Sequence, residues 1–279
     1  MPVEDKKIKH FILMRFFSFD DPNYPHDIYD PDFLSKQLVL AKNNAIPSLE
    51  NQTNKNFNLA FIVNTKFFDN PKYEFVFSTL KESTTLPLTF IKDNERPRLI
   101  EESLNDYDFV ITSRMDFDDF IYKDAIEDTH SKVNECENIL AYGYCRGYTY
   151  VCGELYGFIH PYKRIGYHSV LGSVILKSSF AKNMPFIDAF GFNHGLAKNA
   201  IKSFVEKNGI MFSENMFQQN TSTKAIIYFR HEFAHWQLTK VGTSQVSPPA
   251  NQVPLTDEEI TKKQLADEFG FHLELKSIK

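Results

Sequence analysis

The sequence predicts an α/β protein with a mixed sheet, mostly parallel in its amino-terminal half, antiparallel in its carboxy-terminal half, and covered by helices on both faces. Three observations lead to this class. Over roughly the first 115 residues, short apolar runs alternate with helical stretches, as parallel right-handed crossovers require. After Asp124 the chain becomes rich in Tyr, Gly and β-branched residues, which favours antiparallel strands. At 279 residues, it is long enough for one large domain of this kind.

Four strands and three helices are expected to alternate in the first half. The strands are short and apolar, and they cover residues 11–17, 57–64, 88–91 and a run that begins at Phe109. The helices are expected from about Asp32 to Pro47, from Asn70 to about Lys81, and over residues 98–104. Asn70 and Pro71 supply a cap followed by a proline in the first turn.

The second half is expected to extend the sheet. Antiparallel strands are predicted over residues 139–152, 155–159 and 168–176, with a last strand over 225–229. Residues 186–209 have helical character, interrupted around Gly191 and Gly195.

The carboxy terminus is predicted to be a linker and one helix. Three prolines make residues 242–254 a loop or linker. Thr256 and Glu259 have the spacing of a capping box that starts a helix, and Gly270 marks its end. These boundaries give one domain over residues 1–241, with halves at 1–125 and 126–241, followed by an extension over 242–279.

Composition places the chain among ordinary globular proteins and argues against several classes. The net charge of −5 and the lack of a sustained Lys/Arg run argue against a nucleic-acid partner. No apolar run approaches the ~20 residues of a membrane-spanning helix, and the start MPVEDKKIKH lacks the apolar region of a signal peptide. Three cysteines without CxxC spacing fit a reducing compartment. We therefore expect a cytoplasmic protein, with peripheral contact to a membrane left open.

The strongest candidate for a functional site follows the apolar run that begins at Phe109. Three aspartates, Asp116, Asp118 and Asp119, stand at its carboxyl end, where open α/β sheets bind ligands. In an extended chain, Asp116 and Asp118 point to the same side, so both carboxylates are able to meet one hard cation or a sugar hydroxyl. A divalent metal would also relieve the repulsion between clustered carboxylates. The competing interpretation is a solvated acidic turn that caps the next helix.

Two arginines accompany these acids. Arg114 stands just before them, and Arg15 lies near the carboxyl end of the first predicted strand. Beside a metal, Arg114 would suit a phosphate group, whereas on its own it would form an ordinary surface ion pair. Arg15 is expected to face either a ligand or solvent.

A second chemical signature competes with the first. Residues 231–235 read HEFAH, a literal HExxH, in which His231 and His235 on one helical face would bind zinc while Glu232 activates water. Glu258 or Glu259 would then supply the third ligand of a zinc metallopeptidase. Against this, the preceding AIIYF run predicts a strand, and a peptidase would leave the aspartate cluster without a role. His231 also fits a surface histidine after an edge strand.

Three segments carry a resemblance to a known family: FILMRFFS, IPSLENQTNKNFNLAFIVN and ITSRMDFDD. They resemble a family of rhamnosyltransferase-like proteins, which are metal-dependent glycosyltransferases with the GT-A-like, Rossmann-type fold. The resemblance covers roughly the first 125 residues well and the rest only loosely, and RxDxDD is its most specific element.

The resemblance implies roles for individual residues. Asp116 would contact the ribose or sugar and Asp119 the next group along, while Asp116 and Asp118 would hold Mn²⁺ or Mg²⁺ on the donor diphosphate. His231 stands where such enzymes often supply a further metal ligand. The residues implied to line the donor pocket are Arg15, Gln52, Asn64 and Arg114. Asn64 departs from the family, which often has an aspartate at the end of the second strand.

An inverting transfer also needs a group that takes the proton of the acceptor hydroxyl. Asp188 is the first candidate for this catalytic base and His194 the second, although either fits a helix cap or a core position equally well. The sequence therefore predicts a glycosyltransferase of polysaccharide biosynthesis, moving a sugar such as rhamnose from a nucleotide-diphosphate donor to a glycan or glycolipid acceptor. The alternatives are the zinc peptidase and a catalytically silent carbohydrate-binding domain.

Overall fold

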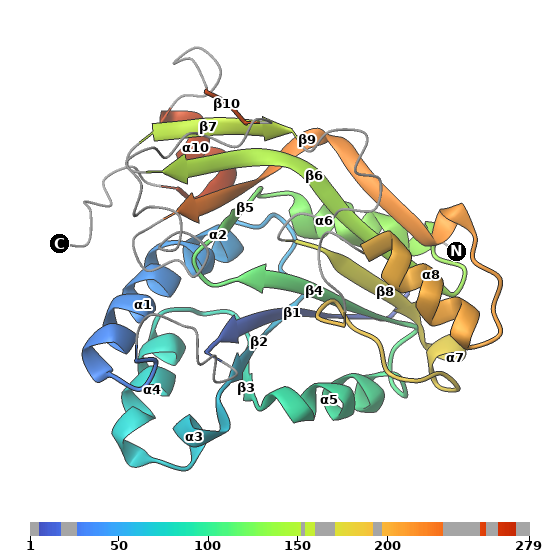
Figure 1. The fold of residues 1–279 in the computed structure, drawn as a ribbon, viewed down its shortest axis with the longest axis horizontal. Coiled ribbons are helices and arrows are strands. Elements are labelled where there is room, and N and C mark those ends of the chain that lie inside the picture. Colours follow the sequence, from blue (N-terminus) through green and yellow to red (C-terminus); the bar gives the residue numbers. More distant parts are fainter. Residues whose placement is uncertain are drawn as a thin grey trace.

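The computed structural model describes the chain over residues 6–17, 27–151, 154–159, 171–191, 197–230, 252–254 and 262–271. Figure 1 shows a mixed sheet with helices on both sides. Its main path runs in the order β10-β7-β6-β8-β4-β1-β2-β3, and two further strands, β5 and β9, pair beside this path. Within the described ranges, no helix is long and apolar enough to cross a membrane.

The first half of the sheet is parallel, as predicted. Its strands are β1 (Ile8–Phe16), β2 (Asn58–Val63), β3 (Leu88–Ile91) and β4 (Phe109–Asp116). β1 lies in the middle, because it pairs in parallel with β2 on one side and with β4 on the other. All carboxyl ends of these strands therefore meet at one edge of the sheet, which is where a crossover fold gathers its loops.

The helices of the first half follow the strands in alternation. They are α1 (Pro31–Asn43), α2 (Ala45–Glu50), α3 (Thr65–Phe68), η2 (Pro71–Tyr73), α4 (Glu74–Glu82), η3 (Asp93–Glu95) and α5 (Arg96–Ser103). The cap at Asn70 is confirmed, since its side chain accepts the Lys72 N–H at 3.0 Å. Pro47 was expected to mark the far end of the first helix or a new turn, and it lies in the first turn of α2, where its missing N–H costs no helical hydrogen bond.

The second half mixes strand directions. Its elements are β5 (Phe120–Ile121), α6 (Ala125–Ser131), η4 (Lys132–Glu135), β6 (Ile139–Val151), β7 (Glu154–Ile159), β8 (Ser173–Lys177), α7 (Ser178–Ala181), α8 (Ala197–Lys207), η6 (Glu214–Met216), β9 (Phe217–Arg230), β10 (Gln252–Pro254) and α10 (Lys262–Phe269). The predicted antiparallel neighbours are confirmed for β4, β8, β6 and β7, and β10, which was expected to be part of a linker, also pairs with β7 in the antiparallel direction. The exception is β9, which is far longer than expected and runs parallel to β6.

One predicted helix starts later than the sequence suggested. The stretch 186–209 was expected to be helical, yet α8 begins at Ala197 and residues 185–188 have no regular structure. Backbone N–H groups of this segment donate to side chains instead of to helical carbonyl oxygens. The Ala189 N–H donates to Thr112 Oγ1 at 3.0 Å, and the Phe190 N–H donates to Asp188 Oδ1 at 2.8 Å. A tertiary contact thus overrides local helical propensity.

Two hydrophobic layers cover the two faces of the sheet. On one face, α1, α2, α4 and α6 pack against the even-numbered residues of β1. On the other face, α5 and α8 pack against Phe11 and Leu13, the odd-numbered ones. This separation follows from the two-residue repeat of a strand, and it confirms that helices lie on both faces.

The helix near the carboxy terminus packs onto the body of the protein. Leu265 and Phe269 of α10, with the following Phe271, contact Phe120 and Tyr148. Gly270 ends the helix as predicted, with φ of +67° that favours glycine. Of the predicted linker, residues 252–254 form β10 and the remainder lies outside the described residues.

Candidate functional site

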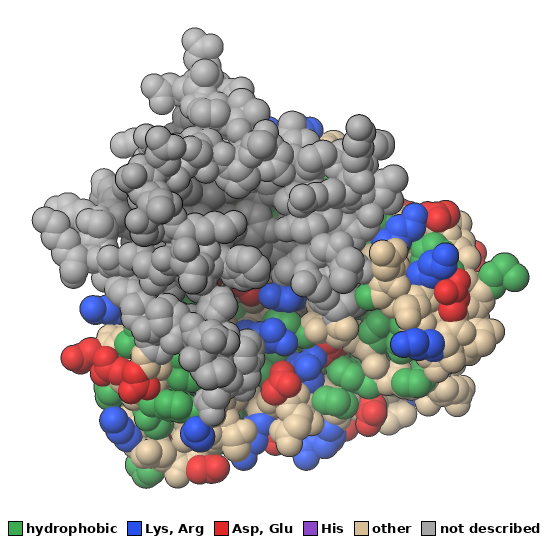
Figure 2. Space-filling model, in the orientation of Figure 1, with side chains coloured by type: hydrophobic (Ala, Val, Ile, Leu, Met, Phe, Trp, Pro, Cys, Tyr) green, Lys and Arg blue, Asp and Glu red, His purple; other side chains and the backbone are tan. Residues whose placement is uncertain are grey.

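Charged side chains gather where β1 and β4 end. The parallel register pairs Leu13 with Arg114 and Arg15 with Asp116, so Arg15, Arg114 and Asp116 share the face covered by α5 and α8. Lys and Arg side chains also gather near the middle of the surface in Figure 2. This edge was the one predicted for ligand binding, and the structure brings Arg15, Arg114 and Asp116 together there.

Three arginines surround one phenylalanine. The guanidinium carbons of Arg15, Arg114 and Arg96 lie 4.2, 4.9 and 5.7 Å from the centroid of the Phe190 ring. The arginines come from β1, β4 and α5, and Phe190 follows Asp188 in the turn described above. A flat guanidinium that stacks on an aromatic face keeps its hydrogen-bonding fork directed outward. We call Phe190 with these three arginines the arginine cluster.

The arginines of the cluster differ in the number of carboxylates with which they pair. Arg96 pairs with Asp93 at 3.1 Å and also with Asp188, whose side chain is fully buried. Arg114 faces Asp116 at 3.8 Å, a longer ion pair, with side chains 18% and 39% exposed. Arg96 is therefore fixed by two anions, whereas the contact of Arg114 leaves room for another.

Bringing these cations together costs free energy. Burial lowers the pKa of Arg15 below its ordinary value, and the charge of Arg114 adds to that effect. The Arg15 and Arg114 charges are at most about 9 Å apart, since both lie near one ring centroid. At an effective dielectric constant of about 20, their repulsion is on the order of 2 kcal/mol. An anionic ligand would remove this cost.

The three aspartates form a turn rather than the end of a strand. β4 ends at Asp116, and the Asp119 N–H lies 3.4 Å from the Asp116 carbonyl oxygen. The expectation that extended chain points Asp116 and Asp118 to one side is therefore wrong, because the chain reverses to begin β5. Asn44 fixes this turn by donating to the Asp118 carbonyl oxygen at 2.8 Å, and Asp119 is 4% exposed.

The turn still suits a hard cation in its ligand type. Asp116 and Asp118 offer carboxylate oxygens at the surface of the sheet edge, and Mg²⁺ is often held by one or two carboxylates with substrate phosphates as the other ligands. In the part of the chain that the structure describes, no group of three His, Cys, Asp or Glu side chains is placed to hold a metal alone. His231, the third predicted ligand, lies outside the described residues, as does the whole HExxH segment.

Two further predicted residues occupy structural positions. Gln52 is 2% exposed, donates to the carbonyl oxygens of Ser48 and Tyr122, and accepts the Ile126 N–H. Its amide is thus occupied by the backbone, and the structure does not bring it to the arginine cluster. Asn64 does lie at the carboxyl edge, where its side chain caps α3 by accepting the Lys66 N–H.

The candidate bases differ in what is known of them. Asp188 accepts hydrogen bonds from Arg96 and from the Phe190 N–H, and burial raises the pKa of its carboxyl while Arg96 opposes that rise. This arrangement suits a buried counter-ion that positions Arg96 and Phe190. His194 lies outside the described residues.

A second polar cluster lies on the opposite face of the same two strands. His10 of β1 contacts His130 of α6 at 3.0 Å and Ser113 of β4 at 2.8 Å, and Ser113 contacts Ser173 of β8 at 2.6 Å. All four are buried. Burial lowers the pKa of His10 well below its ordinary value, and it lowers the pKa of His130 to about 4. We call these four residues the histidine cluster.

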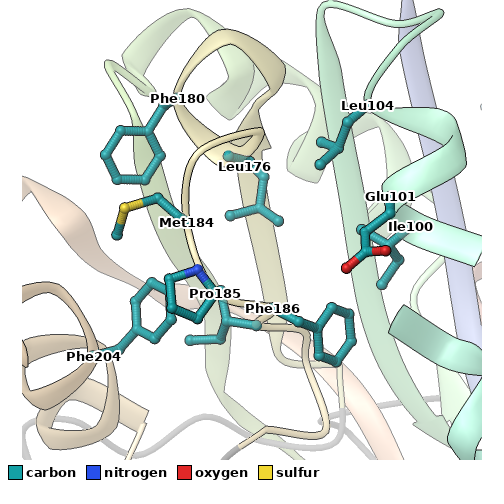
Figure 3. A pocket seen from close by; sticks show the side chains of 11 residues that line it. Ile100, Glu101, Leu104, Leu176, Phe180, Met184, Pro185, Phe186 and Phe204 are labelled. Atoms are coloured by element: carbon teal, nitrogen blue, oxygen red, sulfur yellow. The ribbon is translucent and has the colours of Figure 1, made fainter. Parts of the chain in front are cut away.

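A small apolar hollow lies beside α5, α7 and α8. Figure 3 shows Phe180, Met184, Pro185 and Phe204 along its wall, with Glu101 as its one acidic side chain. Apolar side chains and a carboxylate do not suit an anionic ligand. The arginine cluster is therefore the better candidate site.

Sequence reasoning missed Arg96, Asp93 and Phe190. Arg96 stands at the start of α5, and its partner Asp188 is 92 residues further along the chain. No local pattern connects the two. The one available signal was the position of Asp93 and Arg96 directly after β3, at the same edge as the other candidates.

One family matches most of the chain. Residues 25–228 match the family described as "Putative rhamnosyl transferase". No curated protein matches the chain.

Several solved structures resemble the protein at low identity. S. aureus TarS is 10% identical with a TM-score of 0.41, and the match covers 80% of this chain and 37% of that one. TarS 1–349 in complex with UDP is 12% identical with a TM-score of 0.39, covering 80% of this chain and 60% of that one. A "putative nucleotide-diphospho-sugar transferase from Desulfovibrio desulfuricans G20" is 11% identical with a TM-score of 0.39, covering 80% and 81%. The match thus covers less than two thirds of each of these two TarS chains.

Proposed function

The chain belongs to the rhamnosyl transferase family, and from that premise we propose that it transfers a sugar from a nucleotide-diphosphate donor to a glycan or glycolipid acceptor. The donor would bind at the carboxyl edge of β1 and β4. One observation supports this place above all: Arg15, Arg114 and Asp116 share one face of that edge. Cations there would meet the diphosphate, and carboxylates would meet a metal ion or sugar hydroxyls.

Asp116 and Asp118 would hold Mn²⁺ or Mg²⁺ in this proposal. When bound, such an ion would neutralise charge on the departing diphosphate. Asp116 also faces Arg114, so its carboxylate would keep that guanidinium oriented toward the donor. Rhamnose as the transferred sugar, the GT-A assignment and inversion at the anomeric carbon are part of the same proposal.

The acceptor hydroxyl needs a proton acceptor. Of the two candidates, we favour His194, because both carboxylate oxygens of Asp188 already accept hydrogen bonds within the protein. Asp188 would then act by holding Arg96 and Phe190 in place.

A binding screen followed by one pair of variants tests the function. Nucleoside diphosphates and their sugars, with and without Mn²⁺, should raise the melting temperature, because a ligand that binds only the folded state stabilises it. Sugar release from the donor that binds best should then be lost in Asp118→Ala and kept in Asp267→Ala, an exposed carboxylate on α10. No response to any nucleotide would argue against the proposal, and equal sugar release by both variants would exclude the role of Asp118.

A further inference from the structure

We propose that the arginine cluster is a preformed clamp for a diphosphate group, so that the protein binds this group even without a divalent cation. The inference deepens the proposed function, on which it rests for the identity of the ligand. It assigns binding roles to Arg96 and Phe190, which lie outside the aspartate turn.

The residues of the clamp come from different elements and are joined by contacts with one another. Arg15, Arg114 and Arg96 reach the same ring from β1, β4 and α5. Phe190 is in turn tied to β4, because the neighbouring Ala189 N–H donates to Thr112 Oγ1. A site whose cations are already gathered loses less entropy when the ligand binds.

Asp188 acts in this clamp as a positioning residue. Its fully buried carboxylate binds Arg96 and also accepts the Phe190 N–H, so one side chain fixes both the third arginine and the ring. Asp93 holds the same guanidinium from the outer side. Arg96 is therefore held between two anions, with its guanidinium carbon 5.7 Å from the centroid of the Phe190 ring.

Arg114 has unused capacity for an anion. Among the described residues, its buried Nε has no hydrogen-bond acceptor, and its ion pair with Asp116 is 3.8 Å long. Buried donors in folded proteins nearly always have a partner, so an open one at a charged edge points to a ligand. A guanidinium fork binds two oxygens of one phosphate side by side.

The ligand chemistry follows from the charge. Three guanidiniums surround one ring. Among the described residues, two carboxylates pair with Arg96 and one lies 3.8 Å from Arg114, and this arrangement favours a polyanion over a single carboxylate. A diphosphate carries several negative charges and enough oxygens to contact more than one fork. A phosphorylated acceptor sugar is the other source of a phosphate group, and the experiment separates the two.

The test measures binding of inorganic pyrophosphate to the full chain by calorimetry in excess EDTA. We expect the wild type to bind, and Arg114→Gln to bind about 10-fold more weakly, as expected when a charged hydrogen bond is lost. Phe190→Leu keeps an apolar side chain but loses the ring face, and we expect a loss of about 3-fold or more. Arg98→Gln is the matched control: it lies on α5 two residues from Arg96, is 72% exposed, and should bind like the wild type.

Several outcomes would overturn the clamp. Binding that appears only after Mn²⁺ is added would assign the diphosphate to the aspartate turn alone. Equal pyrophosphate affinities for Arg114→Gln and Arg98→Gln would exclude the arginine cluster as the binding site. Displacement of pyrophosphate by a sugar phosphate but not by any nucleoside diphosphate would assign the site to a phosphorylated acceptor, whereas displacement by a nucleoside diphosphate supports the clamp.

The two proposals fail in different ways. If the wild type transfers sugar but does not bind pyrophosphate in EDTA, the function holds and the clamp is wrong. If pyrophosphate binding depends on Arg114 but no nucleotide sugar is consumed, the clamp holds and the transferase proposal is wrong. Circular dichroism of Phe190→Leu checks that a lost affinity does not come from unfolding.

Discussion

The arginine cluster and the histidine cluster lie on opposite faces of the same two strands, yet they differ in burial, in charge and in how their polar groups are hydrogen-bonded. Arg114 and Ser113 are neighbours in β4, and their side chains point to opposite sides. The histidine cluster is buried, neutral, and bonded from ring to ring and hydroxyl to hydroxyl. The arginine cluster is charged and partly exposed, and it contains a buried donor for which the described chain offers no acceptor.

The difference teaches that burial of polar groups alone does not indicate a site. A sealed network with matched partners specifies packing, because each group has exchanged water for a protein partner. Like charges gathered at a sheet edge do not lower the free energy of folding in the same way. Their repulsion opposes folding, and a bound anion, as in the proposed clamp, would offset it. The following predictions test this distinction, from the largest expected effect to the smallest.

Asp116→Asn should have the largest effect. The carboxylate lies beside Arg114 and in the aspartate turn, so its loss should reduce kcat/KM for sugar transfer by about 100-fold or more. The melting temperature should change little, since the side chain is 39% exposed. Asp267→Asn serves as the control in both assays. If Asp116→Asn had the same kcat/KM as the wild type, the reaction would not depend on Asp116.

Acid should destabilise the protein through the histidine cluster. The pKa of His130 in the folded protein is about 4, below its ordinary value of 6.5. The unfolded chain therefore binds a proton that the folded one does not between these values, and the free energy of unfolding falls as pH drops from about 6.5 toward 4. The expected loss is on the order of 3 kcal/mol.

Urea denaturation at several pH values measures this loss. His130→Gln keeps a polar side chain but does not titrate, so its free energy of unfolding should depend less on pH than that of the wild type. The idea fails if both proteins have the same slope between pH 6.5 and 4.5. Pyrophosphate affinity at pH 7.5 should be the same in both, since the cluster lies on the other face.

Ser113→Ala should separate stability from binding. Removing the hydroxyl takes away the buried partner that His10 Nε2 and Ser173 Oγ share, which should cost about 1–3 kcal/mol of unfolding free energy. The neighbouring Arg114→Gln should weaken pyrophosphate binding with little loss of stability. If Ser113→Ala instead weakened binding as strongly as Arg114→Gln, the two faces would not be independent.

Asp93→Asn should have the smallest effect. Its carboxylate is 49% exposed, and Arg96 keeps the buried Asp188 as a partner. We expect a stability change within about 0.5 kcal/mol, the usual value of an exposed ion pair. A loss as large as that of Ser113→Ala would show that the outer anion, and not Asp188, fixes Arg96.

The sequence was sufficient for strands β1 to β4 and for the edge at which the candidate site lies. Apolar runs define β1 to β4, and parallel pairing then brings Arg15, Arg114 and Asp116 to one end. Three features were not predictable in this way. The parallel pairing of β9 with β6 is not encoded in a two-residue repeat, which is the same in either direction. The turn at Asp116–Asp119 depends on Asn44, and the placement of Phe190 depends on Thr112, so both need contacts from distant parts of the chain.

The predicted site residues differ in the same way, according to whether position in a strand or family resemblance identified them. Arg15 and Arg114 were identified from their position at strand ends, and the structure places them together. Gln52 was identified from family resemblance, and its amide bonds the backbone. His194 and His231 lie outside the described residues and stay predictions.

The packing of α10 indicates where the chain can be shortened without losing contacts to the aspartate turn. The Lys123 N–H, just beyond β5, donates to the Glu268 carbonyl oxygen at 2.7 Å, and Phe271 packs on Phe120 at the end of the aspartate turn. The family match stops at residue 228, well before these anchors. We expect a fragment cut at that boundary to keep the aspartate turn in its sequence but to lose the α10 contacts behind it, so a fragment that retains these contacts extends to at least residue 271.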